Sequence, residues 1–266
     1  MHLPVAQTLF IGVSTKMYMG YARSLTWLEE LVAEVDARPA LAAGRVVPFV
    51  IPSFPVLPEA ARLIAGTPMV LGAQNCGWSD GPWTGEVAPS MLSELGVGLV
   101  EIGHAERRRH FAEDEATIAL KVGAAVDVGL TPLLCVGESE LMAPDVAAET
   151  VYGQINAAVS GDWSLAGQLV VAYEPVWAIG APEPASAEYV SRVAGHLRSG
   201  LARHGLGGIP IIYGGSAKPG LLPQLEAVSG LFLGRFAHDA ANFGKVLDEA
   251  LSFCTADALK TASKGH

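Results

Sequence analysis

The strongest constraint on the fold is a repeated alternation of short apolar runs and longer amphipathic stretches over the 266 residues of the chain. Each apolar run is too short to be a helix and is bounded by glycine, proline or polar residues. Continuous valine, isoleucine and leucine without polar alternation are typical of parallel strands that are buried on both faces. Eight such runs occur, at residues 8–13, 45–51, 69–74, 98–102, 131–136, 168–173, 210–213 and 230–233.

The stretches between the runs have helical spacing, as in Leu25, Leu28 and Leu31, with glutamates available for the solvent side. Alternating strands and helices predict right-handed βαβ units and a parallel sheet. Eight units over this length predict an α/β fold, a closed (β/α)8 barrel in a single domain spanning residues 1–266. The alternative is a doubly wound open sheet, which usually has a GxGxxG turn after its first strand. Here that segment reads VSTKMYMG and lacks the motif.

Charge and cysteine content narrow the possible partners and surroundings. A net charge of −10 disfavours a nucleic-acid groove or an acidic membrane surface, because both attract basic patches. The three cysteines, Cys76, Cys135 and Cys254, lie far apart without CxxC spacing, so neither a disulfide framework nor a zinc site is expected. The N-terminal segment has no signal-peptide pattern, and no apolar stretch is long enough to span a membrane. We expect a cytoplasmic protein that needs no metal or cofactor.

Chemically capable residues follow several of the predicted strands. In a parallel barrel the strand carboxyl ends share one rim, where active sites lie. A lone lysine or glutamate after a strand is usually an ordinary loop residue, but convergence on one rim favours a site. The candidates are Lys16, His104, Glu106, Glu174, the Gly214-Gly215-Ser216 turn and the Gly234-Arg235 turn.

These residue types suit proton transfer on a phosphorylated substrate. Glu174 could remove a proton from a carbon next to a carbonyl, while His104 and Lys16 stabilise the negative oxygen that develops. Backbone N–H groups of residues 214–216 and Gly234 could form a phosphate nest. The predicted chemistry is therefore enolisation of a carbonyl compound that carries a phosphate group.

Several segments carry a resemblance to a known family along almost the whole chain. The most specific is VAYEPVWAIG at 171–180, and VEIGHAERRRHF at 100–111 is also distinctive. Further matches are GAQNCGWSDGPWTGEVAPSML at 72–92, LLCVGE at 133–138 and YGGS at 213–216. With these motifs the chain resembles the triosephosphate isomerase family.

The resemblance implies a TIM barrel and a role for each candidate residue. Lys16 is expected to be the electrophilic cation, His104 the neutral imidazole and Glu174 the catalytic base, with Glu106 pairing with Lys16. The loop that starts at Pro175 is expected to be a lid. The expected substrate- and phosphate-binding residues are Ser14, Gly180, Ser216, Gly234 and Arg235.

The resemblance also implies a homodimer. Residues 77–86 are expected to insert into the partner subunit, with Asn75 and Glu86 near the interface. His110 and His238 are expected to be ordinary loop or surface residues, and Cys135 a packed thiol.

The sequence departs from the family pattern at four places. Ser14 replaces the usual asparagine, which costs one substrate hydrogen bond, and Ala105 replaces a serine. Arg235 stands where a second glycine is usual, and the far hinge of the lid reads GAPEP at 180–184.

These departures admit two interpretations of the substrate. Ser14, Arg235 and the PASAEY stretch at 184–189 resemble relatives that isomerise four-carbon ketose phosphates such as erythrulose phosphate in erythritol catabolism. We favour this interpretation over an ordinary triosephosphate isomerase of glycolysis, which shares the mechanism. A catalytically inactive binding paralogue is a remote third alternative, because none of the catalytic residues is eroded.

Overall fold

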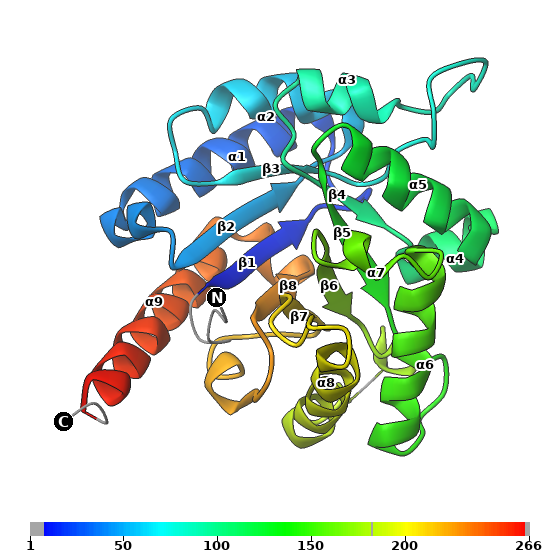
Figure 1. Ribbon diagram of the computed structural model, residues 1–266. Coiled ribbons are helices and arrows are strands. Elements are labelled where there is room, and N and C mark those ends of the chain that lie inside the picture. Colours follow the sequence, from blue (N-terminus) through cyan, green and yellow to red (C-terminus); the bar gives the residue numbers. More distant parts are fainter. Residues whose placement is uncertain (1–7, 182, 264–266) are drawn as a thin grey trace.

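The computed structural model describes residues 8–181 and 183–263, and its eight strands close into a parallel barrel in the order β1 to β8 (Figure 1). The predicted (β/α)8 fold is thus confirmed, and the predicted runs agree with the strands to within two residues. The strands are β1 (Leu9–Ser14), β2 (Val46–Ile51), β3 (Val70–Ala73), β4 (Leu99–Ile102), β5 (Thr131–Val136), β6 (Val170–Tyr173), β7 (Ile211–Gly215) and β8 (Gly230–Leu233).

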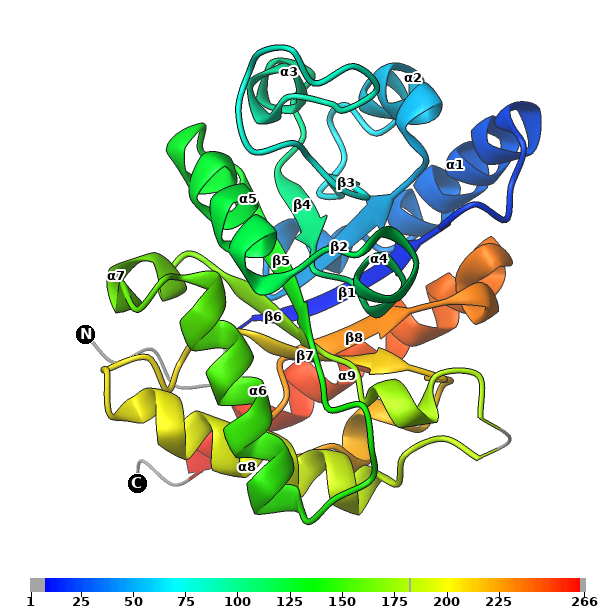
Figure 2. The same ribbon diagram turned by 90° about the vertical axis from the view of Figure 1, so that its right-hand side faces the viewer.

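Helices surround the strands on the outside of the barrel (Figure 2). In the first helix Trp27, Leu28 and Leu31 are buried while Glu29 and Glu30 are exposed, as an amphipathic helix against a sheet requires. The α-helices are α1 (Tyr21–Asp36), α2 (Leu57–Leu63), α3 (Pro89–Glu94), α4 (Ala105–Phe111), α5 (Glu115–Asp127), α6 (Pro144–Ala158), α7 (Trp163–Ala166), α8 (Ala187–Ala202) and α9 (Ala240–Ser263). Single 3-10 turns are η1 (Pro39–Ala43), η2 (Phe54–Val56), η3 (Val176–Ala178), η4 (Leu222–Gln224) and η5 (Arg235–His238).

The interior of the barrel is a packed apolar core and not a channel. The rings of Phe49 and Phe232 lie 5.7 Å apart between centroids, and Leu99 and Leu133 belong to the same buried cluster. Gly12 is required here, because a Cβ at this position would lie 2.1 Å from the Phe49 ring. This filled lower part of the barrel leaves the carboxyl-terminal rim as the place for a site.

The segment between β3 and α3 stands away from the barrel (Figure 1). Within it Trp78 and Trp83 pack together with ring centroids 4.9 Å apart, and Trp83 is 42% exposed. No helix in the described part of the chain is both long and apolar enough to cross a membrane.

Candidate active site

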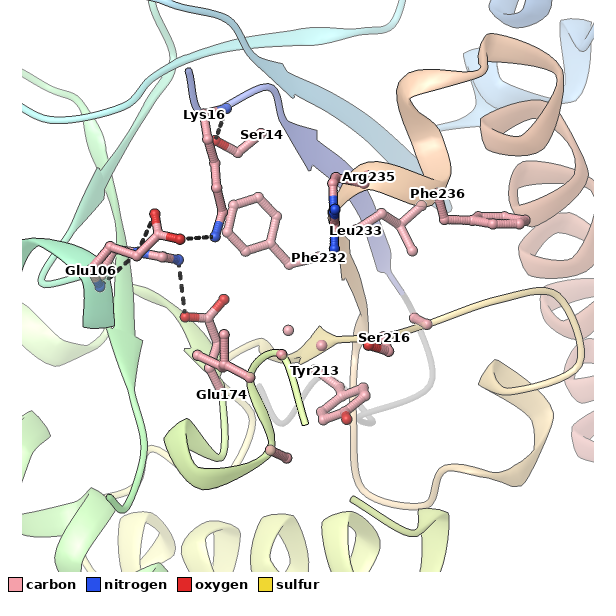
Figure 3. A pocket seen from close by; sticks show the side chains of 18 of the residues that line it. Ser14, Lys16, Glu106, Glu174, Tyr213, Ser216, Phe232, Leu233, Arg235 and Phe236 are labelled. Carbon is pink, nitrogen blue, oxygen red and sulfur yellow. Dashed lines mark hydrogen bonds and ion pairs between the residues drawn. The ribbon is translucent and has the colours of Figure 1, made fainter. Parts of the chain in front are cut away.

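The carboxyl ends of the strands surround a cavity of about 560 Å³ (Figure 3). Every residue that the sequence analysis assigned to catalysis or binding lines it. These are Ser14, Lys16, His104, Glu106, Glu174, Gly180, Ser216, Gly234 and Arg235.

Lys16 follows β1 and is held in place from several sides. Its Nζ lies 2.7 Å from Oε1 of Glu106, and Gln74 Nε2 donates a 2.8 Å hydrogen bond to its carbonyl oxygen. Its backbone has φ of 45°, a left-handed conformation that costs a non-glycine residue free energy and is typical of functional sites. Burial lowers the pKa of Lys16, but the hydrogen bond and charge of Glu106 outweigh this and raise it. The ammonium is therefore charged at neutral pH.

His104 caps the N-terminus of α4, and this position defines its tautomer. Its Nδ1 accepts a 3.1 Å hydrogen bond from the backbone N–H of Glu106, so Nδ1 carries no proton. The proton of the neutral ring is then on Nε2, which lies 3.5 Å from Oε2 of Glu174. The imidazole therefore presents an N–H donor to the cavity. A neutral imidazole at a helix N-terminus is the known arrangement of triosephosphate isomerase.

Glu174 follows β6 directly and is only 7% exposed. Its Oε2 is buried without a hydrogen-bond partner among the described residues. Gly214 makes room for this side chain, because a Cβ there would lie 2.5 Å from both Cγ and Oε1 of Glu174. Its carboxylate therefore has one oxygen at the cavity that no side chain or backbone group of the described residues occupies.

The opposite side of the cavity can receive an anion. Ser216 follows β7 and Gly234 precedes η5, so two turns approach each other there (Figure 3). The Arg235 guanidinium lies over the Tyr18 ring, 5.6 Å from its centroid. Lys218 also lines this side and adds a cation that the sequence analysis did not assign. Backbone N–H groups beside two cations suit a phosphate group.

The loop after Glu174 is tied to a buried carboxylate outside the cavity. Oε1 of Glu138 accepts hydrogen bonds from Trp177 Nε1 at 2.7 Å, Tyr189 OH at 2.9 Å and Tyr173 OH at 3.2 Å. Gly180 at the far end of the loop has φ of 73°, which favours glycine. Of the predicted hinge at 180–184, Pro182 lies outside the described residues.

The sequence did not predict the positions of two groups at or near the cavity, His238 and Glu101. His238, expected to be an ordinary loop or surface residue, lines the cavity, and its Nε2 lies 3.5 Å from the Ser14 carbonyl oxygen. It sits in η5, where the turn after β8 directs it inward; His110 on α4 is exposed as expected. Glu101 lies within β4 and is 4% exposed, with Oε1 3.9 Å from His104 Nε2. Its position two residues before the rim gave no sign of function.

The remaining reactive side chains considered are buried or paired in ways that suit a structural role. Cys135 is buried, and burial raises the pKa of its thiol well above the ordinary value, which suits a packed thiol. Arg107 and Lys121 both pair with Glu113, at 2.7 Å and 2.6 Å. Within the described residues, no group of three or more histidine, cysteine, aspartate or glutamate side chains is arranged to hold a metal ion.

Comparison with known proteins agrees with this geometry. Residues 9–250 match the family described as triosephosphate isomerase. The chain is 47% identical over 254 residues to an L-erythrulose-1-phosphate isomerase of Pectobacterium atrosepticum, covering 93% of this chain and 97% of the relative. It is 38% identical to a protein of the same name from Mesorhizobium japonicum, covering 91% and 96%.

Among solved structures, the triosephosphate isomerase of Bartonella henselae is similar to this one. The TM-score is 0.74 at 30% sequence identity, covering 91% of this chain and 98% of that chain. Fold, cavity and sequence lead to the same result. The chain belongs to the triosephosphate isomerase family and is a phosphosugar isomerase.

Proposed function

We propose that this protein isomerises a four-carbon ketose phosphate, erythrulose 1-phosphate, by moving the carbonyl group to the adjacent carbon. The observation that carries this proposal is Ser14 at the cavity wall in place of the usual asparagine, because the shorter side chain leaves room for an extra hydroxymethyl group. The relatives named L-erythrulose-1-phosphate isomerase support the same substrate.

In the proposed mechanism Glu174 is the base. Its free Oε2 takes the proton from carbon 3, and the electrons of that C–H bond form a carbon–carbon double bond while the carbonyl oxygen on carbon 2 becomes an oxyanion. His104 Nε2–H donates to the oxygens, and the Lys16 ammonium stabilises their negative charge. The same carboxyl group then returns the proton to carbon 2. A proton also moves from the oxygen on carbon 3 to that on carbon 2, leaving a ketone at carbon 3.

The rest of the cavity is proposed to bind the phosphate group of this intermediate and to exclude water from it. The phosphate is proposed to lie against Ser216, Gly234 and Arg235, since backbone dipoles and a guanidinium stabilise an anion there. Inward movement of residues 175–180 would exclude water, which strengthens every electrostatic interaction in the site.

We further propose that the protein is a homodimer. The segment between β3 and α3 supports this, because it stands away from the barrel (Figure 1) and carries the paired rings of Trp78 and Trp83, and aromatic side chains in such a segment suit burial by a partner subunit.

The function is tested by comparing kcat/KM for dihydroxyacetone phosphate, erythrulose 1-phosphate and a five-carbon ketose 1-phosphate. The expected result is the highest value for the four-carbon substrate, and a higher value for dihydroxyacetone phosphate would favour the second candidate. That candidate is ordinary triosephosphate isomerase activity, which the similarity to the Bartonella enzyme supports. Incubation in heavy water distinguishes both from an inactive paralogue, because only an enzyme introduces deuterium next to the carbonyl.

A further inference from the structure

Tyr18 and Arg235 come from opposite ends of the chain and meet at the wall of the cavity. Tyr18 lies in the loop between β1 and α1, and Arg235 begins the turn η5 after β8; both line the cavity. The guanidinium carbon of Arg235 lies 5.6 Å from the centroid of the Tyr18 ring. At this distance a guanidinium is attracted to the negative face of an aromatic ring. The ring therefore gives the long, flexible arginine side chain a preferred position.

The positive charge at this side of the cavity is not compensated by the protein. Among the described residues, no carboxylate lies within ion-pair distance of Arg235 or Lys218, whereas Lys16 is paired with Glu106 at 2.7 Å. Figure 3 shows Arg235 on the side of the cavity opposite Glu106. Two cations without carboxylate partners, in a chain with a net charge of −10, make this side of the cavity suited to an anionic group.

The position of Tyr18 is supported from behind by packing that continues into the core. The ring of His238 lies 5.8 Å from the Tyr18 ring and 6.4 Å from the Trp27 ring, measured between centroids. Trp27 is fully buried, and its Nε1 donates a 3.1 Å hydrogen bond to the Ala237 carbonyl oxygen. Burial lowers the pKa of His238, so its ring is neutral at pH 7 and does not repel the nearby guanidinium. Tyr18 is thus held in place although it is 60% exposed.

A guanidinium that is held in place binds an anion more tightly than one that moves freely. A free arginine side chain must lose rotamer freedom when it binds, and this loss lowers the affinity. A side chain that already lies on an aromatic ring has lost part of that freedom before the ligand arrives. The contact between Tyr18 and Arg235 therefore favours binding of a phosphate group at Arg235.

We propose that Tyr18 is a positioning residue, which holds the Arg235 guanidinium in the orientation that binds the phosphate group of the substrate. This inference rests on the proposed phosphate position at Ser216, Gly234 and Arg235. It applies to three-carbon and four-carbon substrates alike, because both carry the same phosphate group.

The test measures the Kd of inorganic phosphate by 31P NMR titration, which requires no substrate. Arg235→Ala should weaken binding by about tenfold, since a hydrogen bond to a charged group is lost. Tyr18→Leu should weaken it by about two- to fivefold, the range of a cation–π contact at an exposed site. Tyr18→Phe should retain most of the affinity because it keeps the ring. Tyr21→Leu is the matched control and should leave Kd unchanged, because Tyr21 is 53% exposed and does not line the cavity.

The double variant distinguishes positioning from a general structural role. If Tyr18 acts through Arg235, then Tyr18→Leu should have no further effect on Kd in the Arg235→Ala protein. An equal further loss in that protein overturns the inference, and so does an unchanged Kd in Tyr18→Leu or an equal loss in Tyr18→Phe. An unchanged Kd in Arg235→Ala overturns the proposed phosphate position as well. The proposed four-carbon activity fails by a different result, namely a higher kcat/KM for dihydroxyacetone phosphate than for erythrulose 1-phosphate.

Discussion

Replacing Glu101 with glutamine should stabilise the protein, and the gain should grow with pH. Burial raises the pKa of Glu101 from its ordinary value of 4.5 to about 7. The folded state then binds the proton more tightly than the unfolded chain, so between these two pH values the folded protein holds more protons. Stability from this group is consequently present below pH 4.5 and is lost as the pH rises toward 7.

The expected size follows from the shift in pKa. One unit corresponds to about 1.4 kcal/mol, so the unmodified protein should lose roughly 3 kcal/mol relative to Glu101→Gln between pH 4.5 and pH 7. Urea unfolding followed by tryptophan fluorescence at a series of pH values measures the difference. Because the two proteins differ only at this side chain, the pH dependence of the difference reports on the charge of Glu101.

Glu113 provides a control, because its replacement by glutamine should change the stability of the protein in the opposite direction. Burial raises the pKa of this carboxyl group, but hydrogen bonds from Lys121 and Arg107 outweigh burial and hold it below its ordinary range. Glu113→Gln should therefore destabilise the protein at neutral pH, and less so in acid. A Glu101→Gln difference that stays constant from about pH 5 to pH 8 would refute the reasoning, since it would mean that Glu101 titrates alike in folded and unfolded states.

Three further substitutions test the catalytic assignments. Glu174→Gln should lower kcat by about 10²- to 10⁴-fold while inorganic phosphate still binds, because the base acts in the transition state; equal losses of turnover and phosphate affinity would contradict this role. Lys16→Met should lower kcat/KM by about 10²- to 10³-fold and leave Glu106 without its ion-pair partner, and unchanged steady-state kinetics would exclude the assignment. The double change Ser14→Asn with Arg235→Gly should move the ratio of triose to tetrulose phosphate kcat/KM toward the triose by about tenfold, and an unaltered ratio would exclude these two positions as determinants of substrate size.

The barrel was predictable because parallel strands covered by helices need continuous apolar sequence, and this pattern is visible without knowledge of contacts. Strand limits were less accurate where glycines, which usually indicate a turn, continue a strand: β7 extends through Gly215, beyond the predicted end at residue 213. Lys16, His104 and Glu174 were found because they directly follow strands, and the topology then brings them to one rim.

Other members of the site could not be found in this way. Glu101 lies inside a strand, where the sequence indicates only that the segment is short and mostly apolar. Its closeness to His104 depends on which side of β4 faces the inside of the barrel, and this is a three-dimensional fact. His238 and Lys218 lie further along the turns after β8 and β7, so only the path of those turns shows that they reach the cavity.

The three hydrogen bonds to Glu138 have a consequence for the mobility of the loop after Glu174. Trp177 cannot leave its present position without breaking its bond to this carboxylate, so that position of the loop is a discrete, bonded state. Tyr173 and Tyr189 keep the carboxylate partnered while Trp177 is away. Substitutions at the partners of Glu138 should therefore change how readily the loop leaves this position and leave the reacting groups untouched.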